Sequence, residues 1–146
     1  MFLLDTNVIS ELRKARAGRA DKNVTEWAAS APAASMFVSV ITIQELEIGV
    51  LLAERRDPAQ GALLRRWLKE QVLPAFAERI MPVDVTVARR GALLHVPDPR
   101  PVRDALIAAT ALVHGMSVVT RNVTDFAPTG AKVIDPWVDQ TGIRTS

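Results

Sequence analysis

The stretch Phe2-Leu3-Leu4-Asp5-Thr6-Asn7 decides the fold, because a short apolar run ends there in a carboxylate. Similar apolar runs follow at residues 36–40, 79–83, 117–120 and 132–134, with helical patterns between them. Such alternation predicts an α/β fold, in which helices cover the faces of a central parallel sheet of about five strands.

Two of the helical patterns have clear ends. Asp57 and Pro58 suit the N-cap and first position of a helix, with Leu64, Trp67, Leu68 and Val72 on one stripe. Pro74 should end or kink that helix. Residues 101–114 are apolar nearly all round, which predicts a buried helix capped by Gly115.

The composition fits one globular domain over residues 1–146, with 49% hydrophobic and 23% charged residues and a net charge of +2. A disordered chain is excluded. The absence of cysteine excludes disulfides and thiolate metal sites, and it suits a reducing compartment. We expect no signal peptide and no membrane span, because the start lacks a basic region and the apolar stretch 105–113 is too short. A soluble, cytoplasmic protein is therefore expected.

Acidic and amide residues recur where the apolar runs give way to a helix or loop. They are Asp5, Glu45, Asp104, Asn122 and Asp125. Parallel strands end on a common edge, and ligands bind in the crevice outside their carboxyl ends. The pattern therefore predicts one shared pocket, and clustered carboxylates there require a cation.

Each of these residues also has a purely structural explanation. Asp5 suits a helix N-cap, and Thr42 to Glu45 matches a capping box. Asp104 could serve the dipole of its helix, and Asn122 with Asp125 could form a turn. One pocket accounts for all of them together, and Asp104 is hardest to explain otherwise because its helix is apolar.

Oxygen ligands of this kind suit Mg²⁺, with Mn²⁺ as a second possibility. Mg²⁺ often takes one or two protein carboxylates together with substrate phosphate, so a phosphodiester is a natural substrate. The fourteen arginines, against four lysines, are a weak further indication of a phosphate-bearing partner.

Four ordered motifs resemble those of PIN-domain ribonucleases, and more narrowly of VapC toxins of the FitB-like branch. They are Leu3-Leu4-Asp5-Thr6-Asn7, Gln44-Glu45-Leu46-Glu47-Ile48-Gly49, Arg103-Asp104-Ala105-Leu106-Ile107-Ala108-Ala109, and Thr120-Arg121-Asn122 with Asp125-Phe126. The resemblance runs from Met1 to about Trp137 and implies a PIN-like three-layer fold.

The resemblance also implies a function. Family members cut RNA with Mg²⁺ or Mn²⁺ and are held inactive by a small antitoxin, with Asp5, Glu45 and Asp104 corresponding to the metal-site acids. Many relatives place a fourth acid where this chain has Asn122, so Asp125 is the alternative source of that charge. We expect an RNA substrate, an antitoxin partner and a homodimer.

Two other functions fit the same residues. One is a binding module whose acidic pocket receives a basic segment of a partner. The other is a phosphatase or phosphoacceptor with Asp5 as the nucleophile, but Asn7 stands where it needs a second acid. His95 and His114 lie near predicted helix ends and are expected to be structural, and Trp27, Trp67 and Trp137 are expected to pack in the core or against a partner.

Overall fold

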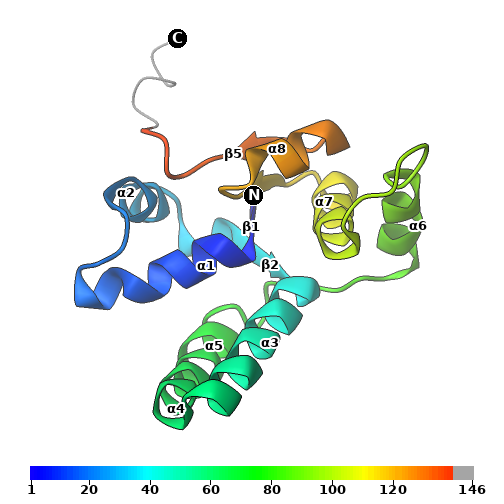
Figure 1. Ribbon diagram of the computed structural model, residues 1–146. Coiled ribbons are helices and arrows are strands. Elements are labelled where there is room, and N and C mark those ends of the chain that lie inside the picture. Colours follow the sequence, from blue (N-terminus) through cyan, green and yellow to red (C-terminus); the bar gives the residue numbers. More distant parts are fainter. Residues whose placement is uncertain (140–146) are drawn as a thin grey trace.

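The computed structural model describes residues 1–139, and its centre is a parallel sheet of five strands in the order β3-β2-β1-β4-β5 (Figure 1). The strands are β1 (Phe2–Leu4), β2 (Met36–Ser39), β3 (Ile80–Met81), β4 (Ser117–Val119) and β5 (Val133–Ile134). All four neighbouring pairs are parallel. Each strand falls within one of the five apolar runs, so the predicted α/β fold is confirmed.

Helices connect the strands. They are α1 (Thr6–Leu12), α2 (Lys22–Ser30), α3 (Val40–Arg56), α4 (Pro58–Trp67), α5 (Leu73–Ala75), α6 (Val85–Leu93), α7 (Val102–His114) and α8 (Val123–Phe126). The predicted helix at 101–114 is confirmed, and it ends at Gly115, whose φ of 67° is a left-handed conformation that glycine adopts without strain.

Two apolar cores lie on the two faces of the sheet, because successive strand residues point to opposite sides. Leu4 and Val119 pack with residues of α1, α2, α3 and α4 in one core. Leu3 and Val118 pack with residues of α7 and α8 in the other. The molecule is therefore a three-layer sandwich of helices, sheet and helices (Figure 1).

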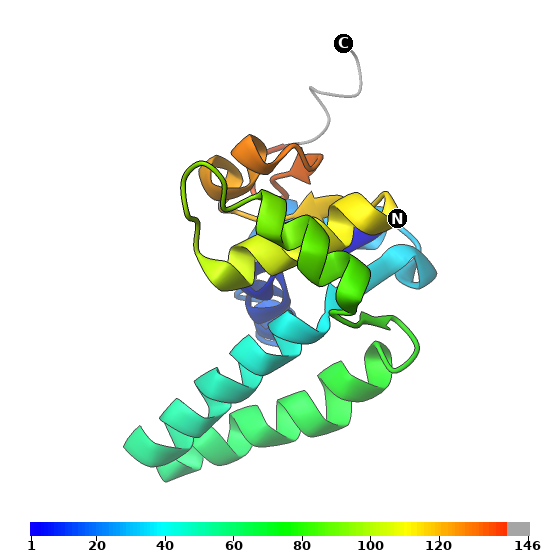
Figure 2. The ribbon, with the colours of Figure 1, turned by 90° about the vertical axis from the view of Figure 1, so that its right-hand side faces the viewer.

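Helices α3 and α4 form an antiparallel hairpin that projects from the body of the molecule (Figure 2). Asp57 caps α4 by accepting a hydrogen bond from the Gln60 N–H, with Pro58 in the first position as predicted. A Cβ on Gly61 would lie 2.4 Å from the Cα of Glu54, so the hairpin packs this closely only with glycine there. Arg65 then links the two helices, at 2.6 Å from Glu47 and 2.8 Å from Glu54.

Pro74 does not stop its helix at once. A π-helical turn, Leu68–Val72, precedes it, and the Leu73 N–H bonds to the Leu68 carbonyl. Such a turn relieves the clash of a proline ring with the preceding turn. The helix ends at Ala75, one residue beyond the proline.

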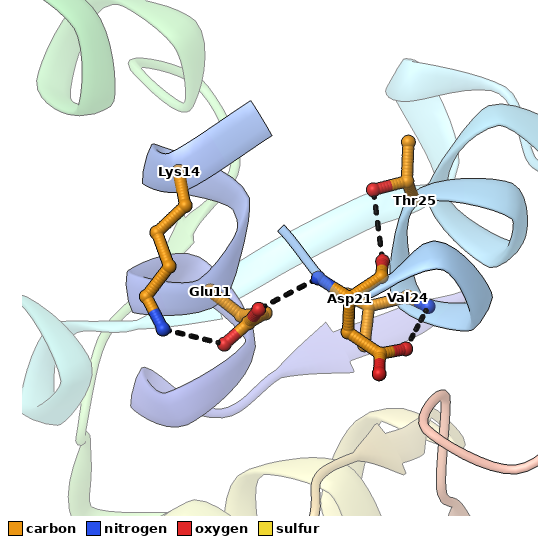
Figure 3. Close-up of polar contacts among 5 residues, drawn as sticks. All are labelled: Glu11, Lys14, Asp21, Val24 and Thr25. Carbon is orange, nitrogen blue, oxygen red and sulfur yellow. Dashed lines mark hydrogen bonds and ion pairs between the residues drawn. The ribbon is translucent and has the colours of Figure 1, made fainter. Parts of the chain in front are cut away.

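Glu11 ties the end of α1 to the start of α2 (Figure 3). Its carboxylate accepts hydrogen bonds from the Asp21 N–H at 2.7 Å and from Lys14 Nζ at 3.1 Å. Asp21 in turn caps α2 by accepting from the Val24 N–H. These contacts fix the direction in which the chain leaves α1.

Across residues 1–139, every helix is either too short or too polar to cross a bilayer.

Candidate functional site

The order of the strands places a crevice beside the central strand. The chain runs from β1 to β2 and β3 on one side, then returns to β4 and β5 on the other. The connection after β1 leads to one side of the sheet and the connection after β4 leads to the other. Open parallel sheets bind ligands at the point where this direction changes, which is called the switch point. Asp5 follows β1 and Thr120 follows β4, so both lie at this edge.

Asp5 is buried at this edge of the sheet, and both of its oxygens are held. Its side chain caps α1 by accepting a hydrogen bond of 2.8 Å from the Thr6 N–H, as the N-cap interpretation predicted. Its other oxygen accepts a hydrogen bond of 2.8 Å from Thr120 Oγ1. Burial raises the pKa of Asp5, and the Thr120 hydrogen bond opposes that shift. Asp5 is thus both a cap and a member of a polar cluster.

Thr120 and Asn7 connect the two strand ends. Asn7 Nδ2 lies 3.3 Å from Thr120 Oγ1 and 3.4 Å from Asp5 Oδ2, and Asn7 Oδ1 accepts from the Arg121 N–H. Thr120 Oγ1 also accepts a hydrogen bond of 3.0 Å from the Asn122 N–H. The loop after β4 is therefore fixed against the start of α1.

Glu45 reaches the crevice from α3. Its Oε1 accepts a hydrogen bond of 2.7 Å from Thr6 Oγ1, and its Oε2 lies 3.5 Å from Arg103 Nε. The capping-box interpretation of Thr42 to Glu45 is wrong, because α3 begins at Val40 and Ser39 caps it. Glu45 lies in the second turn, where its carboxylate is free to face the site instead of a helix end.

Asp104 lies in the first turn of α7, close enough to the other acidic residues for their charges to change its pKa. Burial raises the pKa of Asp104 to about 6, and the negative charges of Asp5, Glu45 and Asp125 add to that effect. The charges of Glu45 and Asp125 also raise the pKa of Asp5. Four carboxylates from four segments of the chain therefore influence one another.

Asn122 and Asp125 are exposed and lie at the start of α8, which follows β4. Asn122 occupies the N-cap position of α8, but its side chain makes no capping hydrogen bond. Asp125 lies in the first turn of α8. Between the two, Asp125 carries the charge that acts on Asp5 and Asp104.

The residue types of this cluster suit a hard divalent cation, since such ions bind carboxylate and amide oxygens. Among residues 1–139, no three His, Cys, Asp or Glu side chains are close enough in their present positions to hold one ion together. One or two carboxylates with water suffice for Mg²⁺. Burial is the main cause of the raised pKa values of Asp5 and Asp104, and the neighbouring negative charges, which a bound cation would offset, add to it.

The histidines and tryptophans lie outside this cluster. His95 Nδ1 accepts a hydrogen bond from the Arg100 N–H after α6, and His114 is the last residue of α7. Trp27 is buried in the first core, and Trp67 and Trp137 pack against it. The structural interpretation of the tryptophans as packing residues is confirmed.

Comparison with known proteins places the chain in a family. The PIN domain model matches residues 2–130. This chain belongs to the PIN-domain family. It is 37% identical over 142 residues to VapC ribonuclease Y4jK of Sinorhizobium fredii, covering 94% of this chain and 98% of that protein. The predicted family resemblance is therefore confirmed.

Another relative and its structure agree. The chain is 35% identical over 145 residues to toxin FitB of Neisseria gonorrhoeae, covering 95% of this chain and all (100%) of that one. The crystal structure of FitAcB from the same organism superposes with a TM-score of 0.84 at 34% identity, covering 94% of this chain and 99% of that one. The PIN-like sheet and helices are thus shared over nearly the whole chain.

Sequence reasoning gave no role to four residues that the structure brings to the site. Thr6 and Asn7 directly follow Asp5, Thr120 directly follows β4 beside β1, and Arg103 precedes Asp104. The sequence signal that could have identified these four residues is that each lies within two positions of a predicted site residue. Their hydrogen-bond partners could be assigned only once β4 was known to neighbour β1.

Proposed function

We propose that this PIN domain, spanning residues 1–146, is a Mg²⁺- or Mn²⁺-dependent endoribonuclease and the toxin of a type II toxin–antitoxin pair that acts in the cytoplasm. The observation that carries the proposal is that Thr6 holds both Asp5, at the switch point of the sheet, and Glu45, from α3, while Thr120 orients the second oxygen of Asp5. The relative named a VapC ribonuclease supports the activity, and the relative named toxin FitB supports the biological role.

The candidate metal ligands in this proposal are Asp5, Asp104 and Glu45. One or two of them would bind the ion directly, and water would complete its coordination. A bound divalent cation would polarise a phosphoryl oxygen of RNA and lower the pKa of a water that attacks phosphorus. The protein supplies the negative charges and their orientation. Thr120 and Thr6 hold Asp5 and Glu45 respectively, so that neither carboxylate must be ordered when substrate arrives.

Asp104 must be ionised to bind a cation. With a pKa of about 6 it is mostly ionised at neutral pH, and a nearby cation would lower that pKa further. Asp125 is the better candidate for the fourth acidic position, because its charge acts on two of the three candidate ligands. Asn122 can contribute only an uncharged oxygen.

The antitoxin in this proposal binds along the α3–α4 hairpin. An open cavity of about 350 Å³ there is lined by residues of α1, α3 and α4, including Glu45, Gly49, Leu64 and Trp67. It leads from apolar side chains directly to a carboxylate of the site. An amphipathic segment could lie in such a groove and place a cationic side chain on Glu45.

Cleavage of RNA tests the activity. Purified protein should cut RNA when MgCl₂ or MnCl₂ is present and should stop when EDTA is added. Asp5→Asn and Asp104→Asn should both lose cleavage while circular dichroism shows a folded protein. Cleavage that persists in both variants would refute the assignment of the site.

The alternative function is a binding module. The contact between Arg103 and Glu45 favours this alternative, because it shows that an arginine can lie against a carboxylate of the acidic cluster. Under that alternative the wild-type protein would bind a basic peptide but would not cut RNA with either metal. A homodimer is proposed under both alternatives, and light scattering measures it.

A further inference from the structure

Arg103 is a cation placed against the acidic cluster by its own chain. It reaches from the first turn of α7 to Glu45 on α3, with Nε 3.5 Å from Oε2. Its positive charge also lowers the pKa of Asp104. The guanidinium therefore neutralises part of the charge that we assign to cation binding.

This contact is loose. Strong charge-assisted hydrogen bonds are about 2.7–2.9 Å long, whereas the Arg103 contact is 3.5 Å. The Arg103 side chain is also 51% exposed. By contrast, Arg65 lies within 2.6 Å and 2.8 Å of two glutamates and holds two helices together. Arg103 is therefore free to leave Glu45 at little cost.

We propose that Arg103 is a substrate-positioning residue that exchanges partners, from Glu45 in the metal-free site to a phosphate oxygen of RNA when a divalent cation is bound. A cation on Glu45 would repel the guanidinium and take the carboxylate from it. The planar guanidinium matches two phosphate oxygens. The proposal rests on the proposed ribonuclease function.

The exchange has a measurable consequence. Arg103 competes with the cation for Glu45, so the cation binds less tightly than it otherwise would. Once released, Arg103 adds one phosphate contact, so RNA binding becomes tighter when the cation is present. Metal and RNA then favour each other's binding through this one side chain.

Calorimetric titration with MnCl₂ in the absence of RNA measures the competition. Arg103→Gln should bind Mn²⁺ about two- to fivefold more tightly than wild type, the range of an exposed ion pair. Arg121→Gln is the matched control, because it removes the same charge from the loop after Thr120 without a contact to Glu45. Equal affinities in wild type and Arg103→Gln, or the same gain in Arg121→Gln, would overturn the proposal.

Fluorescence anisotropy with a labelled single-stranded RNA measures the second half of the exchange. In EDTA, wild type and Arg103→Gln should bind the RNA equally. In CaCl₂, with the RNA checked for integrity on a gel, wild type should bind more tightly and Arg103→Gln should not. The salt dependence of the variant should also be shallower by about 0.7, the value of one phosphate contact on a single strand.

The controls separate this proposal from the proposed function. Arg103→Lys should recover part of the gain in RNA affinity that CaCl₂ produces, because lysine keeps the positive charge but lacks the planar guanidinium that contacts two phosphate oxygens. Weaker RNA binding by Arg103→Gln already in EDTA would show a fixed contact and overturn the exchange. If the wild type itself bound no Mn²⁺, the metal-dependent function would fail first and the exchange with it.

Discussion

Thr120 and Asp5 are 115 residues apart in the sequence, yet Thr120 Oγ1 donates a hydrogen bond of 2.8 Å to Asp5 Oδ2 in the protein interior. The bond spans the edge between β1 and β4, which is where the direction of the chain connections changes. Asp5 Oδ1 is held by the Thr6 N–H at the same time. Both oxygens of a buried carboxylate are thus oriented by its neighbours.

Replacing Thr120 with valine should weaken both stability and activity. Valine has nearly the same shape but removes the hydroxyl, which leaves Asp5 without one hydrogen bond and the Asn122 N–H without its acceptor. A hydrogen bond to a charged group contributes about 1.5–3 kcal/mol, so urea unfolding should show a loss of that size. RNA cleavage should fall because Asp5 is no longer held.

Thr110→Val is the matched control for that experiment. Thr110 is equally buried, but its hydroxyl donates at 2.8 Å to the Leu106 carbonyl within α7, away from the acids. Its loss should cost about 1 kcal/mol or less and leave cleavage unchanged. If both threonine variants lost activity alike, a specific role of Thr120 on Asp5 would be excluded.

Asp104→Asn should abolish RNA cleavage without unfolding the protein. The change removes one charge from the proposed metal site and keeps nearly the same volume. Wild-type activity should also rise with pH, with a midpoint at or below about 6, because a bound cation would lower the pKa of Asp104 from its value in the metal-free protein. A gel assay with MgCl₂ from acid to neutral pH measures both. Full activity in the folded variant would remove Asp104 from the site.

The same variant should change how stability depends on pH in EDTA. The pKa of Asp104 is about 6 in the folded protein and near its ordinary value of 3.8 when unfolded, so the folded state binds the proton more tightly. Its ionisation therefore destabilises the fold increasingly as pH rises from about 4 to 6. Asp104→Asn should melt at a higher temperature than wild type at pH 7, with the difference vanishing towards pH 4. A difference in melting temperature that stays constant from pH 4 to pH 7 would contradict the raised pKa of Asp104.

Mg²⁺ or Mn²⁺ should raise the melting temperature of the wild type, because an ion that binds only the folded state stabilises it by mass action. At a concentration about a hundred times the dissociation constant, the gain should be roughly 2.7 kcal/mol. Asp84→Asn alters the cap of α6, outside the cluster, and should keep the shift, whereas Asp5→Asn should lose it. No shift in the wild type at millimolar levels of either ion would remove the basis for a metal site.

The sequence predicted the sheet well because each strand is a short apolar run, and the three strands β1, β2 and β4 are largely buried. A polar residue directly follows β1, β4 and β5, as Asp5 follows Leu4. Local patterns were less reliable where a tertiary contact competes. Thr42 and Glu45 have the spacing of a capping box, but Ser39 already caps the helix and Thr6 provides a partner for Glu45.

Side chains on a helical stripe also could not be sorted into core and surface from spacing alone. Leu68 and Trp67 are adjacent in the sequence and both were predicted to lie on one apolar face. Leu68 is 2% exposed in the core, while Trp67 packs at its edge and lines the cavity next to Glu45. The π-helical turn that begins at Leu68 changes the helical period, and no sequence pattern indicated it.

Substitutions at Gly49 test the groove on the α3–α4 hairpin without disturbing the core. Gly49 lies in the interior of α3 and lines the cavity of about 350 Å³, and apart from the adjacent backbone of its own helix and its two chain neighbours, no atom lies within 4 Å of where a Cβ would be. Gly49→Ala should therefore stabilise the protein by about 1 kcal/mol, the difference between the helix propensities of the two residues. Gly49→Phe should instead fill the groove while the fold persists. With a co-expressed antitoxin, calorimetry should show near wild-type affinity for Gly49→Ala and a loss of at least about tenfold, or 1.4 kcal/mol, for Gly49→Phe. Equal affinities for the two variants, both folded, would place the antitoxin on another surface.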